Sequence, residues 1–205
     1  MLKVGITGGI GVGKTTVCKI FATLGIPIYE ADSRSKWLLV NDNRLKTAIQ
    51  TSFGQEVYLV NGQINREFLA QQIFTNPLAG KHLESLIHPA VRKDFEEWLT
   101  IQSTQSNILP YVLKEAALLV EAGSYRELDQ LIVVTADKEV RIKRVLERDT
   151  HRTQAELEAI MLKQLPEEEK IQRANFVIYN NGTEALIPQV LKIHQELCLL
   201  KNNKT

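Results

Sequence analysis

Residues Gly8–Thr15 have the sequence GGIGVGKT, which matches the pattern G-x-x-x-x-G-K-S/T at every position. The run before it, Lys3–Thr7, is short and rich in β-branched residues, as is typical of a buried strand. From Lys14 to Leu24, apolar residues recur at spacings of three and four, and this period predicts a helix. A second strand is expected at Pro27–Tyr29. A strand, a glycine-rich turn, a helix and a second strand form a βαβ unit, which predicts a parallel sheet covered by helices.

Each residue type in this loop has a task in binding phosphates. Glycines allow the backbone to turn its N–H groups inward, into a concave nest that accepts phosphate oxygens, and the N-terminus of the following helix attracts the same anion. The Lys14 ammonium reaches the β- and γ-phosphates of a nucleoside triphosphate, and the Thr15 hydroxyl is a ligand for Mg²⁺. The alternative is a turn that merely joins a strand to a helix, and the complete pattern in its context argues against it. The residues expected to contact the triphosphate are Gly9, Ile10, Gly11, Val12, Gly13, Lys14, Thr15 and Thr16.

The composition limits the classes of function. The chain has 205 residues, enough for one domain with inserted lobes, and a formal net charge of +1. This charge gives no overall case for a nucleic acid or membrane partner. Cys18 and Cys198 lie far apart without histidines at metal-ligand spacing, which argues for a reducing compartment and against a zinc site. Since neither a signal peptide nor a bilayer-spanning apolar run is present, we expect a soluble cytoplasmic protein, either a monomer or a weak homo-oligomer.

The middle of the chain, residues 33–107, has an almost entirely helical pattern. An Asn61-Gly62 turn signal lies within Val57–Gln63, which is expected to form a small hairpin or an irregular loop. Because no strong strand pattern appears, we interpret this block as a helical lobe inserted between sheet strands. Its helix candidates are Arg44–Thr51, Arg66–Phe74 and Pro89–Ile101.

Strand patterns resume after this block and alternate with helical ones. The further strands are expected at Ile108–Leu113, Leu131–Thr135 and Phe176–Tyr179. The further helices are expected at Lys138–Asp149, Thr153–Leu162, Glu167–Ala174 and Thr183–Leu200. The predicted fold class is therefore α/β, a three-layer P-loop NTPase sandwich with a parallel sheet of about five strands.

A carboxylate, Asp32, follows the second expected strand. The carboxyl ends of parallel strands open onto one crevice, so Asp32 is expected on the same side of the sheet as the glycine loop. A carboxylate there can accept the proton of an attacking hydroxyl, as in a kinase. Aspartate is also a good N-cap, and Asp32-Ser33 precedes a helical pattern. The two roles are compatible, and the sequence leaves both open.

Three arginines, Arg141, Arg144 and Arg148, recur at helical spacing on the helix expected at Lys138–Asp149. A solvated, salt-bridged surface is the usual meaning of such a run. The other interpretation is a lid whose guanidinium groups close on phosphates, because planar forks stabilise charge on a transferring phosphoryl group. The presence of the glycine loop favours the lid.

His88-Pro89 precedes another helical pattern, and Arg92 follows one turn later. Proline is favoured at the first position of a helix, which is where we expect Pro89. A helix start is a sufficient explanation of Pro89. A role of His88 or Arg92 in binding an anionic substrate stays open.

Taken in order, these motifs resemble the dephospho-coenzyme A kinase family, from the first strand to about Asn181. The glycine loop is generic, whereas the ordered set is specific. The matching segments are Val4–Val17, Glu30–Asp32, Asn65-Arg66 with Leu69 and Phe74, Leu86–Pro89 with Val91-Arg92, Ala117–Glu121, and finally Gln164, Lys170, Ala174-Asn175 and Asn180–Gly182.

The resemblance implies transfer of the ATP γ-phosphoryl group, with Mg²⁺, to the ribose 3′-hydroxyl of dephospho-coenzyme A. It implies a nucleotide-binding core (1–32, 108–137 and 175–205), a helical substrate lobe (33–107) and a helical lid (138–174), as in nucleoside-monophosphate kinases. The catalytic residues that it implies are Asp32 as the base, Lys14 and Arg144. The lid contacts to ATP would be Arg144 and Arg148, and the acceptor-side residues would be Asp32, Arg66, His88 and Arg92.

Three positions depart from the family pattern. Glu30 and Asn175 each replace an aspartate, and Glu115 lies in a segment that in many members contains a proline. We interpret Glu115 as a candidate for the acid that holds the water shell of Mg²⁺.

Two rival functions share parts of this pattern. A kinase for another small alcohol would share the loop and the lid, but the ordered Asn65-Arg66 and His88-Pro89 motifs favour dephospho-coenzyme A. A GTPase switch would carry N-K-x-D and D-x-x-G motifs, which the sequence lacks.

Overall fold

The structure is a computed structural model that describes residues 1–104 and 109–202. The chain divides into two compact units, one of Met1–Glu30 with Gln105–Thr205 and one of Ala31–Thr104. Within the described residues, no helix has the length and apolar character needed to cross a bilayer.

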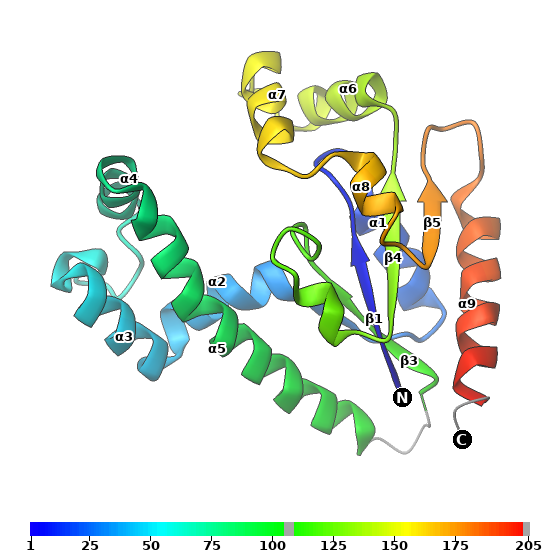
Figure 1. The fold of residues 1–205 in the computed structure, drawn as a ribbon, viewed down its shortest axis with the longest axis horizontal. Coiled ribbons are helices and arrows are strands. Elements are labelled where there is room, and N and C mark those ends of the chain that lie inside the picture. The colour runs from blue at the N-terminus through cyan, green and yellow to red at the C-terminus, as the bar shows by residue number, and fades with distance from the viewer. Residues whose placement is uncertain (105–108, 203–205) are drawn as a thin grey trace. The chain divides into compact units, whose positions relative to one another are not determined.

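The first unit is built on a sheet of five parallel strands in the order β2-β3-β1-β4-β5 (Figure 1). This arrangement confirms the predicted α/β class and the five-stranded parallel sheet. The strand order reverses beside the central strand β1, and in open parallel sheets ligands bind outside the carboxyl ends of the strands at such a point. The strands are β1 (Leu2–Thr7), β2 (Ile28–Glu30), β3 (Tyr111–Glu115), β4 (Gln130–Thr135) and β5 (Phe176–Tyr179). The expected start of β3 at Ile108 lies outside the described residues.

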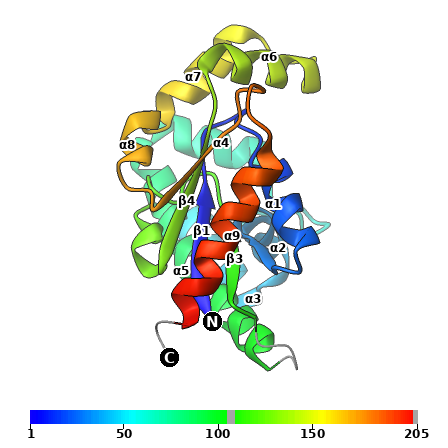
Figure 2. The same ribbon diagram turned by 90° about the vertical axis from the view of Figure 1, so that its right-hand side faces the viewer.

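Helices α1 and α9 cover one face of this sheet, where they lie side by side (Figure 2). Phe21 of α1 and Leu197 of α9 are buried in one cluster with Val4 and Ile132 of the sheet. On the opposite face, Leu119 from the segment between β3 and β4 lies against Gly5, since alternate strand residues point to opposite sides. The helices of this unit are α1 (Lys14–Thr23), η2 (Ser124–Glu127), α6 (Lys138–Arg148), α7 (Gln154–Lys163), α8 (Glu167–Ile171) and α9 (Leu186–Asn202).

Two helices of the first unit differ from the prediction by three residues at one end. Helix α8 ends at Ile171 instead of Ala174, and α9 begins at Leu186 instead of Thr183. Asn175 explains the first difference, because its N–H and its Oδ1 both bond to the backbone of Leu131, at 2.9 and 2.8 Å. The chain therefore has to leave the helix to join β4.

The second unit is helical in its described residues, apart from one isolated antiparallel bridge between Tyr58 and Ile64. This bridge encloses the Asn61-Gly62 turn, so of the two alternatives expected there, a small hairpin or an irregular loop, the structure has the hairpin. The helices share a buried cluster that includes Leu38, Ile49 and Leu69. The helices are α2 (Ala31–Asn41), α3 (Asn43–Phe53), η1 (Gln55–Val57), α4 (Arg66–Thr75) and α5 (Pro77–Ser103).

The prediction that a helix begins at Pro89 is wrong, because Pro89 lies inside α5. An interior proline removes one helical hydrogen bond and costs about 3 kcal/mol. Apolar residues before and after it, among them Ile87 and Val91, nevertheless pack against the same cluster. Partial burial of several apolar side chains along this face offsets the cost, since full burial of a single large side chain is worth about 1.5–3 kcal/mol. The true start is capped by Asn76, whose Oδ1 accepts from Leu78 N at 3.0 Å.

Candidate active site

The phosphate loop, Gly8–Thr15, connects the carboxyl end of β1 to the first residues of α1. Gly11 and Gly13 have φ angles of 81° and 89°, in the left-handed region that favours glycine. Gly13 is the N-cap of α1 and contributes no side-chain cap, so the N-terminus of the helix opens directly onto the loop. The loop thus has the backbone geometry of an anion-binding nest.

Lys14 lies at the mouth of this loop, and its side chain is only 13% exposed. Its Nζ donates to the Gly8 carbonyl oxygen at 3.0 Å and lies 3.9 Å from Glu115 Oε1. Glu115 ends β3 and pairs in register with Glu30, the last residue of β2. Two carboxylates therefore end neighbouring strands at the edge where the loop begins.

The cysteine one turn after Lys14 is not poised for chemistry. Burial is the main cause that raises the pKa of the Cys18 thiol to about 12. The carboxylates of Glu115 and Glu30 raise this pKa further, whereas Lys14 lowers it. Cys18 is thus a neutral, buried side chain beneath the loop.

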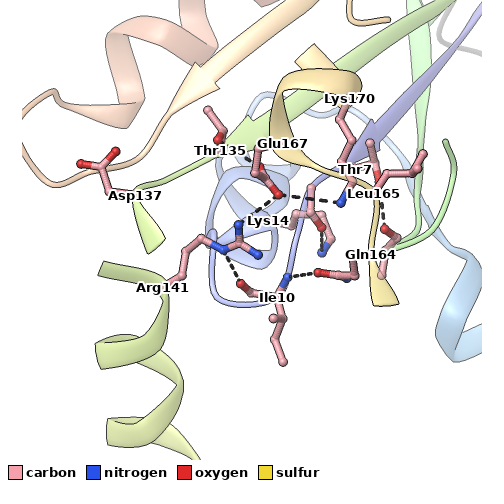
Figure 3. A network of polar contacts seen from close by, with 12 residues as sticks. Thr7, Ile10, Lys14, Thr135, Asp137, Arg141, Gln164, Leu165, Glu167 and Lys170 are labelled. Carbon is pink, nitrogen blue, oxygen red and sulfur yellow. Dashed lines mark hydrogen bonds and ion pairs between the residues drawn. The ribbon is translucent and has the colours of Figure 1, made fainter. Parts of the chain in front are cut away.

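One wall of the loop is formed by side chains from the α6–α8 segment, residues 138–171 (Figure 3). Arg141 Nε donates to the Ile10 carbonyl oxygen at 2.9 Å. Gln164 Oε1, which follows α7, accepts from the Ile10 N–H at 3.1 Å. Both polar groups of one loop residue are therefore bonded to side chains distant in sequence.

A chain of charged groups supports this wall (Figure 3). Glu167 Oε1 lies 3.1 Å from Arg141 Nη1 and 3.7 Å from Lys170 Nζ, while its Oε2 accepts from Thr135 Oγ1 at 3.0 Å. Lys170 is fully buried, and its Nζ lies 3.1 Å from Glu121 Oε1. Two acids and two bases compensate one another, which burial of charge requires.

The opposite side of the loop contacts Asn180, directly after β5. Asn180 Nδ2 donates to the Val12 carbonyl oxygen at 2.8 Å, and its Oδ1 accepts from Arg144 Nη2 at 3.3 Å. Arg144 Nη1 is buried and makes no hydrogen bond within the described part of the chain. Arg144 is therefore oriented by Asn180 and keeps a donor for a further acceptor.

The glycines at Gly9 and Gly13 allow these contacts. A Cβ on Gly9 would lie 2.2 Å from Arg141 Nη2 and 2.6 Å from Glu167 Oε1. A Cβ on Gly13 would lie 2.4 Å from Asn180 Nδ2. The loop thus requires glycine at both positions for close approach of neighbouring side chains.

Arg148, the third expected lid arginine, is exposed and paired with its sequence neighbour Asp149. Its Nε and Nη2 donate to the two carboxylate oxygens of Asp149, each at 2.9 Å. These hydrogen bonds are the main cause that lowers the pKa of Asp149. The structure brings Arg141 and Arg144 to the loop, whereas Arg148 remains an exposed, paired residue.

The expected acceptor-side residues all lie in the second unit. Asp32 is an exposed residue in the first turn of α2, which begins at Ala31, so its expected role as N-cap is wrong. Arg66 and His88 are exposed, on α4 and α5. Arg92 is exposed one turn after His88 and pairs with Glu96 at 3.3 Å.

Sequence reasoning missed the parts played by Gln164, Glu167 and Lys170. Gln164 and Lys170 belong to the closing motif, but the charged run Glu167–Lys170 has the composition of a solvated helix end. The only local signal is the three-residue spacing of Glu167 and Lys170, which places them on one helix face. Their partners, Ile10, Arg141 and Glu121, are remote in sequence.

A glycine loop at the carboxyl end of a central parallel strand, flanked by arginines from a helical segment, defines a P-loop kinase. The dephospho-CoA kinase family model matches residues 2–185. The chain belongs to the dephospho-CoA kinase family, whose reaction completes the biosynthesis of coenzyme A.

Individual relatives agree with this assignment. The chain is 36% identical to the dephospho-CoA kinase of Bacteroides fragilis, with 98% of this chain and 99% of the relative covered. It is 37% identical to that of Chlorobaculum tepidum, over 96% and 95% of the two chains. The structure of the dephospho-CoA kinase from Campylobacter jejuni matches with a TM-score of 0.68 at 26% identity, over 99% of this chain and 98% of that one. The family resemblance of the motifs is thereby confirmed.

A more distant structure shares only the fold. A shikimate kinase from Acinetobacter baumannii matches with a TM-score of 0.51 at 15% identity, over 98% of this chain and 94% of that one.

Proposed function

We propose that this chain transfers the γ-phosphoryl group of ATP to the ribose 3′-hydroxyl of dephospho-coenzyme A on the loop Gly8–Thr15. The observation that carries the proposal is the position of Lys14. Its ammonium lies between the Gly8 carbonyl oxygen and the Glu115 carboxylate, at 3.0 and 3.9 Å. Phosphate oxygens can replace such partners, because a lysine ammonium is a mobile point charge with three donors.

ATP binding would use the backbone N–H groups of the loop other than that of Ile10, which donates to Gln164, together with the N-terminus of α1. The positive φ angles of Gly11 and Gly13 support this assignment, because alternating backbone conformations create the nest. Lys14 would contact the β- and γ-phosphates.

Mg²⁺ fits the donors at this edge. The exposed Thr15 hydroxyl is a hard oxygen ligand of the kind that Mg²⁺ prefers, and the Glu115 carboxylate, 3.9 Å from Lys14 Nζ, would hold water molecules bound to the ion. Within the described residues, no three His, Cys, Asp or Glu side chains form a metal cluster. Mg²⁺ in kinase sites takes most of its ligands from substrate phosphates and water, and the same would hold here. When bound, Mg²⁺ neutralises charge on the β- and γ-phosphate oxygens.

Asp32 would act as the general base. It lies on α2, directly after β2, and its carboxylate is exposed. As the acceptor oxygen bonds to the γ-phosphorus, the bond from this phosphorus to the β,γ-bridging oxygen breaks, and the hydroxyl proton passes to Asp32. ADP leaves with the electrons of the broken bond.

The acceptor would bind to the second unit, Ala31–Thr104, which corresponds to the substrate lobe expected at residues 33–107. The exposed side chains of Arg66, His88 and Arg92 suit a substrate that carries phosphates. We therefore assign these residues to acceptor affinity, not to the chemical step.

Residues 138–174 would form the lid. The buried, unbonded Nη1 of Arg144 supports a contact to the γ-phosphate, since such a donor gains most from an anionic partner. Arg148 would exchange Asp149 for ATP when the lid closes. Closure would exclude water from the site, and this exclusion prevents a kinase from hydrolysing ATP.

The test is product identification. The purified protein is incubated with Mg-ATP and dephospho-coenzyme A, and the product is compared with authentic coenzyme A by mass spectrometry and ³¹P NMR. We expect coenzyme A with phosphate at the 3′ position, and none when EDTA removes the metal. Phosphate at another hydroxyl, or ADP without a phosphorylated acceptor, would contradict the proposal.

A further inference from the structure

We propose that Gln164, Arg141 and Glu167 are positioning residues that hold the Gly9–Ile10 part of the phosphate loop and couple nucleotide binding to the anchoring of the α6–α8 segment. This inference rests on the proposed function, in which the loop binds ATP.

The first observation is that Ile10 is held from both sides. Its carbonyl oxygen accepts from Arg141 Nε at 2.9 Å, and its N–H donates to Gln164 Oε1 at 3.1 Å. A backbone N–H has one proton to donate, so this group fixes the shape of the loop and leaves phosphate binding to the other N–H groups. Since the two side chains come from α6 and from the residue after α7, the segment holds the loop at two points.

The second observation is that Arg141 is itself immobilised. Its side chain is 7% exposed and lies 3.1 Å from Glu167 Oε1. Glu167 is bonded to Thr135 at the end of β4 and lies beside the fully buried Lys170. Charged side chains with several partners in a low-dielectric environment have few alternative positions. The arginine therefore holds Ile10 in a defined place.

The third observation is the close packing of this pair on the loop. Arg141 Nη2 and Glu167 Oε1 occupy the space where a side chain of residue 9 would begin. The loop and the ion pair are complementary in shape, so displacement of either one moves the other.

The coupling follows from reciprocity. If the attached segment favours the loop shape that binds nucleotide, then nucleotide must favour attachment of the segment by the same factor. Occupied loops would hold α6–α8 more firmly than empty ones.

The decisive variant is Gln164→Met, which keeps the size of the side chain and removes the acceptor of the Ile10 N–H. Its matched control is Gln154→Met on the same segment, where an exposed amide donates to Glu158 at 3.3 Å and the loop is not involved. We expect ADP affinity to fall about ten-fold in Gln164→Met, as one lost hydrogen bond implies, and to remain within about two-fold in the control. The KM for ATP should rise in parallel, while the KM for dephospho-coenzyme A stays constant.

Amide hydrogen exchange supplies a readout that general destabilisation does not mimic. Without nucleotide, the Ile10 amide should be protected in the wild type and exchange faster in Gln164→Met. Gln164→Glu retains an acceptor oxygen and should restore protection of this amide. ADP should slow exchange in α6–α8 of the wild type, and to a smaller extent in Gln164→Met and in Glu167→Gln.

The inference is overturned if Gln164→Met binds ADP like the wild type, or if Ile10 exchange is unchanged by this substitution. Failure of the assignment of the loop to ATP looks different, because the wild type itself would then not bind ADP, and failure of the acceptor assignment would leave these ADP and exchange results unchanged.

Discussion

Asn180 donates a hydrogen bond to the Val12 carbonyl oxygen at 2.8 Å, although 168 positions separate the two residues. The backbone N–H of Asn180 bonds to Thr135 at 2.9 Å, and its Oδ1 accepts from Arg144. One buried residue thus joins the phosphate loop and helix α6, through its side chain, to the sheet, through its backbone N–H.

The substitution Asn180→Asp keeps the shape of this side chain but replaces the donor by a carboxylate oxygen that faces the Val12 carbonyl. We expect the free energy of unfolding to fall by about 1–3 kcal/mol, because two buried acceptors then face each other. ATP affinity should also fall, through repulsion between the new charge and the phosphates. Urea denaturation and ADP titration measure the two effects. Asn43→Asp, at an exposed position in the first turn of α3, is the control and should change both quantities much less.

Glu115→Gln tests the assignment of this carboxylate to the water shell of Mg²⁺. We expect the Mg²⁺ concentration for half-maximal activity to rise about ten-fold or more, as for other residues that hold metal-bound groups. Glu30→Gln, at the register partner on β2, is the control. Equal Mg²⁺ requirements in the wild type and Glu115→Gln would remove Glu115 from this role.

Pro89→Ala tests the finding that α5 continues through its proline. Alanine restores the missing N–H without a large loss of packing, because residue 89 is exposed. The unfolding free energy should rise by about 1–3 kcal/mol, part of the cost of an interior proline. Glu84→Ala, also exposed on α5, should change it little. Destabilisation by Pro89→Ala would mean that the helix depends on the proline ring.

The thiol of Cys18 predicts a loss of stability at alkaline pH. Its pKa is about 12 in the folded protein and near 9.0, the ordinary value, in the unfolded chain. Between these values the unfolded state binds fewer protons, so the unfolding free energy falls as pH rises, by at most about 1.4 kcal/mol per pH unit from this group.

Urea denaturation between about pH 9 and 10.5 measures this slope. This pH range lies between the pKa of the Cys18 thiol in the unfolded chain and its pKa in the folded protein. Cys18→Ala should show a shallower decline than the wild type. Tyr58 and Tyr111, whose pKa values burial also raises, contribute equally to both proteins. Parallel declines would show that Cys18 does not titrate as proposed.

The sheet, the phosphate loop and most helix positions are predictable from the sequence because their signals are local. The β-branched run before Gly8 and the apolar period after Lys14 each lie within a few residues of the element that they specify. Each of the five strands is predictable from such a run. The expectation that they are parallel came from the βαβ unit at the start of the chain.

The wall of the site was not predictable, because its contacts join residues without a local pattern. Nothing in the sequence around Ile10 indicates that Gln164 bonds to its N–H, or that Glu121 meets Lys170. The start of α5 was missed for a related reason: Pro89 is a strong local signal for the start of a helix, and packing on both sides of it overrides that signal.

The central claim is that Asp32 takes the proton of the acceptor while the loop holds ATP. The most direct measurement is the single-turnover rate of coenzyme A formation by Asp32→Asn, together with its affinity for ADP. A lost general base predicts a rate about 10²–10⁴-fold below the wild type with unchanged ADP affinity. A wild-type rate in Asp32→Asn would contradict the account.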